Sequence, residues 1–183
     1  MKLPSVANVR EIRQVADAWN AWRRGALLPR RDQMRLKDLD GVFDRCFMLE
    51  MRSPTEMVFV FMGSMFQRVT GHDYTGLNFL EYSDPGIRAL RSRRMMTLVN
   101  KPCACVWTIC DETLPMDTPR FVGLALPLLP TEPCRPPFVF EVMAVLDDDI
   151  LIERAPEPGV LRLTDMFRYI DIGAGHPGRE LES

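Results

Sequence analysis

The chain has 183 residues, 46% of them hydrophobic and 26% charged, and its formal net charge is −2. This length fits one domain with extensions, and the near-neutral charge excludes a whole-molecule attraction for nucleic acid or anionic lipid. No apolar run reaches the length of a membrane span, and the first residues lack an apolar signal core, so we expect a cytoplasmic protein with no membrane contact.

The segment from Asn8 to Arg24 has the apolar spacing of an amphipathic helix. Asn8 with Glu11 resembles a capping box, and Gly25 can provide the left-handed cap at the other end. A second, short helix is expected from Asp32 to Leu39, because Asp32 can cap it and apolar residues follow at helical spacing.

Two strands and a helical crossover are predicted next. Residues 43–51 alternate between apolar and polar side chains, as in a strand with one buried face. The continuous apolar run Met57–Met62 is typical of a strand buried on both faces. Ser53-Pro54-Thr55 is a turn between the two, which should therefore form a hairpin. Residues 64–100 lack strand alternation, and Asp84-Pro85 resembles a helix opening, which indicates a helical crossover.

Three further strands are predicted after the crossover, at Cys103–Cys110, Phe121–Leu129 and Phe138–Leu146. The segments between them contain prolines and other turn residues that cannot extend a ladder. Phe167–Ile172 is a possible added strand in the tail. The predicted order is therefore two strands, a helical crossover and three strands.

Two short motifs give this order a resemblance to a known family. Leu28-Pro29-Arg30-Arg31 follows the N-terminal helix, and the turn Gly71-His72-Asp73-Tyr74-Thr75-Gly76 closes the first helix after the hairpin. The chain resembles the compact bacterial single-domain PAS family over residues 15–145. The resemblance implies an α+β fold: a five-stranded antiparallel sheet with a helical crossover between strands 2 and 3, plus an N-terminal amphipathic helix. It divides the chain into an N-terminal helix at 1–31, a PAS core at 32–150 and a C-terminal extension at 151–183.

The PAS resemblance implies a sensory or regulatory domain that binds a small ligand or a partner signalling protein and acts through protein–protein interaction. In the family, the ligand cavity lies between the crossover helices and the inner face of the sheet. The aromatic and methionine residues that this would bring around a ligand are Phe59, Phe61, Met65, Phe79, Met95, Trp107, Phe121 and Phe140. The alternative is that these side chains fill the core, which would leave a ligand-free interaction scaffold. Strand parity places Glu141 opposite Phe140, facing solvent or a helix rather than a ligand.

The other face of the sheet needs a cover, which the N-terminal helix can supply. In the family, such a helix commonly mediates pairing of two PAS domains, so we expect a homodimer. The predicted interface residues are Val9, Ile12, Val15, Trp19 and Trp22. The alternative is that the helix is an intramolecular lid on the protein's own sheet.

Cofactor chemistry has weaker support in the sequence, and the identity of any cofactor is left open. His72 could hold haem iron, as in haem-binding PAS sensors, but a histidine inside a turn is more often exposed. The reactive cysteine of photosensory PAS domains has no counterpart between Ser64 and Pro102, which puts flavin photochemistry in doubt. Five cysteines are an odd count, which favours reduced thiols over disulfides, and no metal site is expected because Cys103 and Cys105 share a strand face that Cys110 does not.

Catalysis and nucleic-acid binding are not expected. Neither histidine lies in a nucleophile motif, and the chain has no phosphate-binding glycine loop. Arg88, Arg91 and Arg94 fall close to one helical face that could contact phosphates, although arginine faces are more often solvated or paired with acids.

Overall fold

The structure is a computed structural model, and it describes residues 1–109, 120–146 and 164–183. The described residues form one six-stranded sheet in the order β2-β1-β5-β4-β3-β6, and every neighbouring pair is antiparallel. The strands are β1 (Cys46–Ser53), β2 (Glu56–Met62), β3 (Cys103–Ile109), β4 (Phe121–Leu128), β5 (Phe138–Val145) and β6 (Met166–Asp171). The helices are α1 (Arg10–Trp22), α2 (Ser64–Thr70) and α3 (Arg88–Asn100), with short 3-10 turns at Ser5–Ala7, Arg31–Gln33, Leu36–Leu39 and Phe43–Arg45.

The α+β class and the predicted order of elements are confirmed. β1 and β2 form the expected hairpin, α2 and α3 make the crossover, and three strands follow it. The sheet has a sixth strand, because β6 pairs with β3 along its whole length and extends the sheet beyond the five strands expected. The predicted end of the third strand at Cys110 lies outside the described residues.

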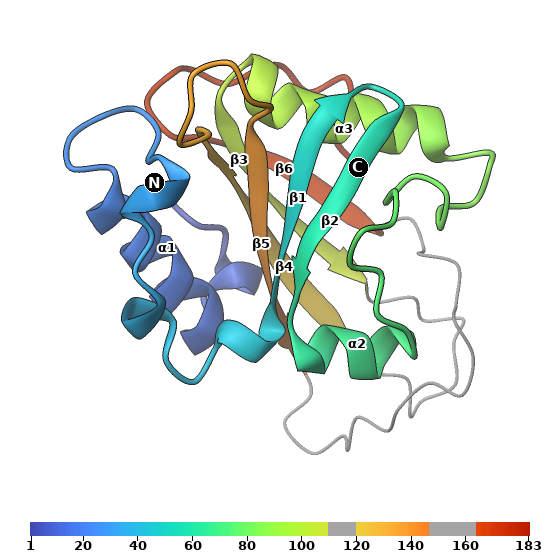
Figure 1. Cartoon of the computed structure of the whole chain (residues 1–183), viewed down its shortest axis with the longest axis horizontal. Helices are drawn as coiled ribbons and strands as arrows, with labels where there is room; N and C mark the ends of the chain where they lie inside the picture. The colour runs from blue at the N-terminus through green and yellow to red at the C-terminus, as the bar shows by residue number, and fades with distance from the viewer. Residues whose placement is uncertain (110–119, 147–163) are drawn as a thin grey trace.

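The sheet is covered on both faces by different helices (Figure 1). α1 packs on one face, where its apolar residues join those of the sheet in one buried cluster. α2 and α3 pack on the other face, where a second buried cluster includes Met95 and Leu98 of α3. All eight residues of β4 are buried, because this strand lies between the two layers.

Both edges of the sheet are also covered. The turn after α2 lies along β2, where Phe59 N donates to Leu77 O at 3.0 Å and Phe79 N donates to Met57 O at 2.7 Å. Asn78 adds a side-chain cap, since its Oδ1 accepts from Met57 N at 3.1 Å. The Gly71–Gly76 motif thus leads into the segment that seals this edge. At the other edge, Ser183 pairs with β6.

Two details of the N-terminal region were predicted wrongly. α1 begins at Arg10 with Val9 as its N-cap, and no side chain caps it, so the capping box at Asn8 does not form. The short helix expected from Asp32 to Leu39 is replaced by two separate 3-10 turns. The Arg31–Gln33 turn is held instead by Arg30, whose N donates to Gln33 Oε1 and whose guanidinium pairs with Asp32 at 2.9 Å.

The apolar stripe of α1 faces the protein's own sheet. Ile12, Val15 and Trp19 are each 0% exposed, and Trp22 is 2% exposed. Trp19 Nε1 donates to Pro127 O of β4 at 3.0 Å, and Trp22 Nε1 donates to Asp38 Oδ2 at 2.8 Å. This is the arrangement of the intramolecular lid, so these side chains are not available to a second subunit while α1 stays on the sheet. A dimer contact through this stripe stays a prediction that requires α1 to detach.

We predict that Trp19→Ala lowers the free energy of unfolding by about 3–5 kcal/mol, because it removes a fully buried indole and leaves its Pro127 acceptor unpaired. Urea unfolding measures the loss, and light scattering measures the molar mass, which should not change. Arg13→Ala, on the exposed side of the same helix, is the control and should alter neither quantity. A change of molar mass without a loss of stability would instead assign the stripe to a subunit interface.

Candidate functional site

Small residues on the α3-facing side of the sheet leave room for one large side chain. Trp107 of β3 is paired with Gly123 of β4, and a Cβ atom at Gly123 would lie 2.1 Å from Trp107 Cε2. Only glycine therefore lets the indole lie against the strand. Ala125 pairs with Cys105 on one side and with Glu141 on the other, so small side chains continue across the sheet.

The indole ends on a buried acid. Trp107 Nε1 donates to Glu141 Oε2 at 2.9 Å, and Glu141 is 3% exposed. Burial raises the pKa of Glu141 to about 7, and this rise is opposed by the hydrogen bond from Trp107 and by the positive charge of Arg91. Strand parity predicted that Glu141 faces solvent or a helix rather than a ligand. In the structure Glu141 is buried on the face that α3 covers, together with Trp107. Near neutral pH this carboxyl can therefore donate or accept a proton.

α3 contributes a buried arginine to the same face. Arg91 is 7% exposed, and its guanidinium lies over the Phe79 ring, 5.1 Å from the centroid. Its Nη1 donates to Ser83 Oγ, and Ser83 Oγ in turn donates to Phe79 O at 3.2 Å. Burial lowers the pKa of Arg91 to about 10, against the opposing effect of the Glu141 charge. The side chain is still a cation at neutral pH.

A second arginine of α3 lies one turn further along. Arg94 is 4% exposed, and its guanidinium lies over the Phe167 ring of β6, 4.5 Å from the centroid. Arg94 Nε donates to Leu181 O at 2.7 Å, and Tyr169 Oη donates to Arg94 O at 3.2 Å. Burial lowers the pKa of Arg94 as well.

These contacts correct the interpretation of the arginine face of α3. Arg91 and Arg94 do not form a solvated stripe, because both side chains turn toward the sheet and lie on aromatic rings. The sequence carried this signal, since positions 91, 94, 95 and 98 follow the helical spacing that includes the buried Met95 and Leu98. Because arginine is charged, these two positions were not counted with the buried face of the helix, although their spacing places them there.

The residues predicted to line one cavity are divided between the two faces of the sheet. Phe59, Phe79, Met95, Trp107 and Phe121 belong to the cluster beneath α3. Phe140 instead belongs to the α1 cluster, where its ring is 6.3 Å from that of Trp22, and Phe61 packs against the same cluster. Met65 is half-buried in α2. The assignment of Phe61 and Phe140 to the α3 side was therefore wrong. Phe140 is the strand neighbour of Glu141 and faces the opposite side, whereas Phe61 departs from the face of Phe59 at an irregularity in the β1–β2 register.

The residues considered for cofactor binding are His72 and the cysteines. His72 lies in the turn after α2, and the buried cysteines are protonated thiols. His72 is half-buried in its turn, where its ring makes an edge contact with Tyr74 at 5.0 Å. Haem ligation by His72 stays a prediction. Burial raises the pKa of Cys103 to about 12 and that of Cys105 well above its ordinary value, so both remain thiols. Within the three described ranges, no cluster of histidine, cysteine and acidic side chains could hold a metal ion.

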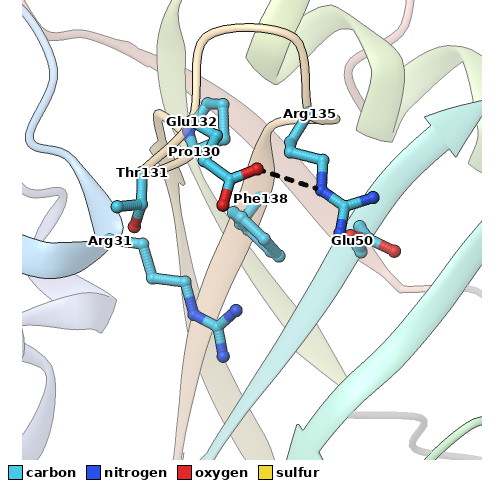
Figure 2. A pocket seen from close by; sticks show the side chains of 7 residues that line it. All are labelled: Arg31, Glu50, Pro130, Thr131, Glu132, Arg135 and Phe138. Atoms are coloured by element: carbon cyan, nitrogen blue, oxygen red, sulfur yellow. Dashed lines mark ion pairs between the residues drawn. The ribbon is translucent and has the colours of Figure 1, made fainter.

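A separate surface cleft lies where the Leu-Pro-x-Arg motif meets the sheet (Figure 2). Its volume is about 250 Å³, and its lining residues are Arg31, Glu50, Pro130, Thr131, Glu132, Arg135 and Phe138. Arg31 lies over the Phe138 ring, 4.9 Å from the centroid, and Arg31 N donates to Leu129 O at 2.9 Å. Glu132 pairs with Arg135 at 3.7 Å. The motif thus ties the segment after α1 to the end of β4, and none of the residues predicted to contact a ligand line this cleft.

Comparison with known families agrees with the fold. A family model described as PAS domain matches residues 7–135. The chain belongs to the PAS domain family. PAS domains are in general sensory or regulatory rather than catalytic, and they commonly mediate protein interactions and dimerisation. No curated protein and no solved structure matches the chain. Among the described helices, none is both long and apolar enough to cross a membrane.

We predict that Gly123→Ala destabilises this PAS domain by about 1–3 kcal/mol, because the new methyl group overlaps the Trp107 indole and pushes it from Glu141. At an unobstructed site the same change would be neutral or stabilising. Urea unfolding followed by tryptophan fluorescence measures both the loss and the displaced indole. Gly86→Ala, which meets only the end of the Asp84 side chain, should stay within about 0.5 kcal/mol of the parent. Equal effects for both changes would contradict the close approach at Gly123.

The raised pKa of Glu141 predicts a pH-dependent stability. The folded-state pKa of about 7 lies above the ordinary glutamate value of about 4.3, so the folded chain keeps a proton that the unfolded chain releases. The free energy of unfolding therefore falls as pH rises through that window and becomes constant above it. Glu141→Gln removes this dependence, because the amide does not titrate.

We expect the stability of Glu141→Gln relative to the parent to increase by about 2–3 kcal/mol between pH 5 and pH 8. Urea midpoints across this range measure the change. Glu81→Gln, at an exposed acid, should parallel the parent at every pH. A constant difference between the Glu141→Gln variant and the parent would mean that Glu141 titrates normally.

Proposed function

We propose that this PAS domain is a sensory module that holds a small ligand beneath α3, with Glu141, Trp107 and Arg91 as its polar contacts, and that it signals through protein–protein interaction. The observation that carries the proposal is the hydrogen bond from Trp107 to Glu141, made among the buried apolar side chains beneath α3. Perturbed ionisable groups of this kind concentrate at functional sites.

The free-energy cost of burial supports a functional role for these groups. Burying a carboxyl and a guanidinium stabilises the folded protein less than burying apolar side chains of the same volume. Among the described residues, the face beneath α1 buries no charged side chain, which supports the view that the fold can cover a sheet face without them. A ligand that exchanges hydrogen bonds with Glu141 and Arg91 would account for their presence on one face only.

The chemistry of the group indicates the class of ligand. The cluster beneath α3, to which Trp107 belongs, also contains the aromatic and methionine side chains of Phe59, Phe79, Met95 and Phe121. This environment suits a small, mostly apolar molecule with one polar end. Because Glu141 can carry a proton near neutral pH, that polar end can be either a donor or an acceptor.

Movement of α3 would convert ligand binding into a signal. Arg91 and Arg94 place α3 in contact with the buried group and with β6, so a ligand that displaces Arg91 favours a different position of the helix. The shift can be no larger than the difference in ligand affinity between the two positions. A homodimer and a cytoplasmic location stay predictions from the sequence.

A ligand-free scaffold is the second candidate. The observation that favours it is that the Trp107 indole occupies the space over Gly123, so the protein's own side chain fills the place a ligand would need. In that case the domain would act only through its surface.

Native mass spectrometry of the freshly purified protein, compared with its denatured mass, tests the proposal. We expect extra mass that disappears on unfolding, and a lower bound fraction for Glu141→Gln and Arg91→Gln. Arg93→Gln, on the exposed side of α3, is the matched control and should bind like the parent. The apo mass in every sample would favour the scaffold, and equal binding by all variants would assign the ligand to another part of the surface.

A further inference from the structure

The chain returns to the sheet after β6 as a short strap, residues 173–183. Phe167 N donates to Ser183 O and Ser183 N donates to Phe167 O, each at 3.1 Å, which is the reciprocal pairing of antiparallel strands. The strap therefore occupies the outer edge of β6 by main-chain hydrogen bonds. Within residues 173–183, Ser183 is the residue that pairs with β6 through its main chain.

Glu182 extends this pairing with its side chain. Its Oε1 accepts from Tyr169 N at 2.8 Å, where a longer strand would supply a main-chain carbonyl. The side chain is 6% exposed, and it also lies 3.2 Å from His176 Nε2 and 3.5 Å from Arg168 Nη1. The outward N–H groups of Phe167 and Tyr169 are thus satisfied by two neighbouring residues of the strap.

The strap is also held by α3. Leu181 O accepts from Arg94 Nε at 2.7 Å, and the Leu181 side chain packs against the cluster beneath α3. Arg94 lies between the Phe167 ring and this carbonyl, so it links the position of the helix to the position of the strap. Any movement of α3 along the sheet has to break or carry this hydrogen bond.

We propose that the outer edge of β6 is a docking edge for an extended segment of a partner protein, and that the strap is its intramolecular occupant. An extended peptide that adds to a sheet edge gains main-chain hydrogen bonds, and it gains specificity from alternate side chains. Among residues 173–183, Ser183 alone pairs with β6 through its main chain, so an extended segment that pairs along more of β6 makes more main-chain hydrogen bonds than these residues do. This surface is distinct from the proposed ligand contacts.

The strap defines the chemistry of the partner segment. An apolar residue is needed at the position of Leu181, and an acid is needed at the position of Glu182 to meet Tyr169 N and Arg168. Gly173, Gly175 and Gly178 have φ values of 115°, 89° and 111°, so the connection to β6 is built on residues that change direction at little cost. β3 and Ser183 pair with opposite edges of β6, so release of the strap leaves the β3–β6 pairing in place.

Peptide binding to the full chain tests the docking edge. The probe is a fluorescein-labelled peptide with the sequence of residues 176–183, and fluorescence polarisation measures its affinity. We expect Leu181→Ser combined with Glu182→Lys to weaken the strap and to bind the probe at least about tenfold more tightly than the parent. A probe carrying the same two changes should not bind. Arg179→Gln, elsewhere in the strap, should behave like the parent.

Hydrogen exchange measures whether the two substitutions release the strap without unfolding the rest of the protein. In the doubly changed chain, the amides of Phe167 and Tyr169 should exchange faster, while that of Ile170, on the strand side that faces β3, should stay protected. Fast exchange at the edge without probe binding would overturn the docking edge. Global exchange would mean that the strap is part of the core, which also contradicts the proposal.

Arg94→Lys tests the link to α3, because lysine keeps the charge and loses the planar contact with Phe167 and the Nε donor. We expect about tenfold faster exchange at Ser183 and Phe167, with Arg93→Lys as the control. Unchanged exchange rates at Ser183 and Phe167 would mean that the position of the strap does not depend on α3. If light scattering shows a dimer that forms only when the strap is intact, the strap of a second copy of this chain occupies the edge. That result would contradict docking of a separate partner protein. None of these outcomes depends on whether a ligand binds near Glu141.

Discussion

The central strands of the sheet are buried on both faces, and the rest of the structure follows from that constraint. β4 and its neighbours have few polar side chains, so two separate layers must cover them. α1 supplies one layer with Trp19 and Trp22, and α2 and α3 supply the other. The two layers differ in charge, because the buried charged residues of the described chain, one acid and two arginines, all lie on the α3 side. Under the proposed function, the α1 side stabilises the fold and the α3 side is the part that responds to a ligand.

Much of the fold could be predicted because hydrophobic periodicity is a local property. The alternation before Met51, the apolar run to Met62 and the proline-rich separators gave the correct order of strands. The region of residues 32–39 was harder, since its conformation depends on distant partners: Arg30 reaches Thr131 O and Trp22 reaches Asp38. Such contacts override local helix propensity. β6 was uncertain for the same reason, because a strand is defined by the neighbour it pairs with.

The candidate site was only partly predictable. Trp107 was expected on the correct face. Glu141 was expected to face solvent or a helix rather than a ligand, because Phe140, its neighbour in the strand, had been assigned to the ligand side. The close approach of Trp107 to Gly123 depends on strand register, which the sequence does not specify. Arg91 and Arg94 were expected to be solvated or paired with acids because they are charged, although their helical positions place them on the buried side of α3. Buried ionisable groups are the places where a sequence departs from the simple rules of folding.

The covered edges of the sheet have a consequence for aggregation. β3 and β5 are nearly continuous runs of apolar or β-prone residues without proline or glycine, the kind of segment that stacks into fibrils when it can recruit another chain. They are protected by position, since fibril growth from the native state has to start at β2 or β6. The segment around Asn78 covers the edge of β2, and the strap covers the edge of β6 through a few hydrogen bonds. Resistance of this protein to self-assembly into fibrils therefore rests on two short peripheral segments, not on the strands that carry the hazard.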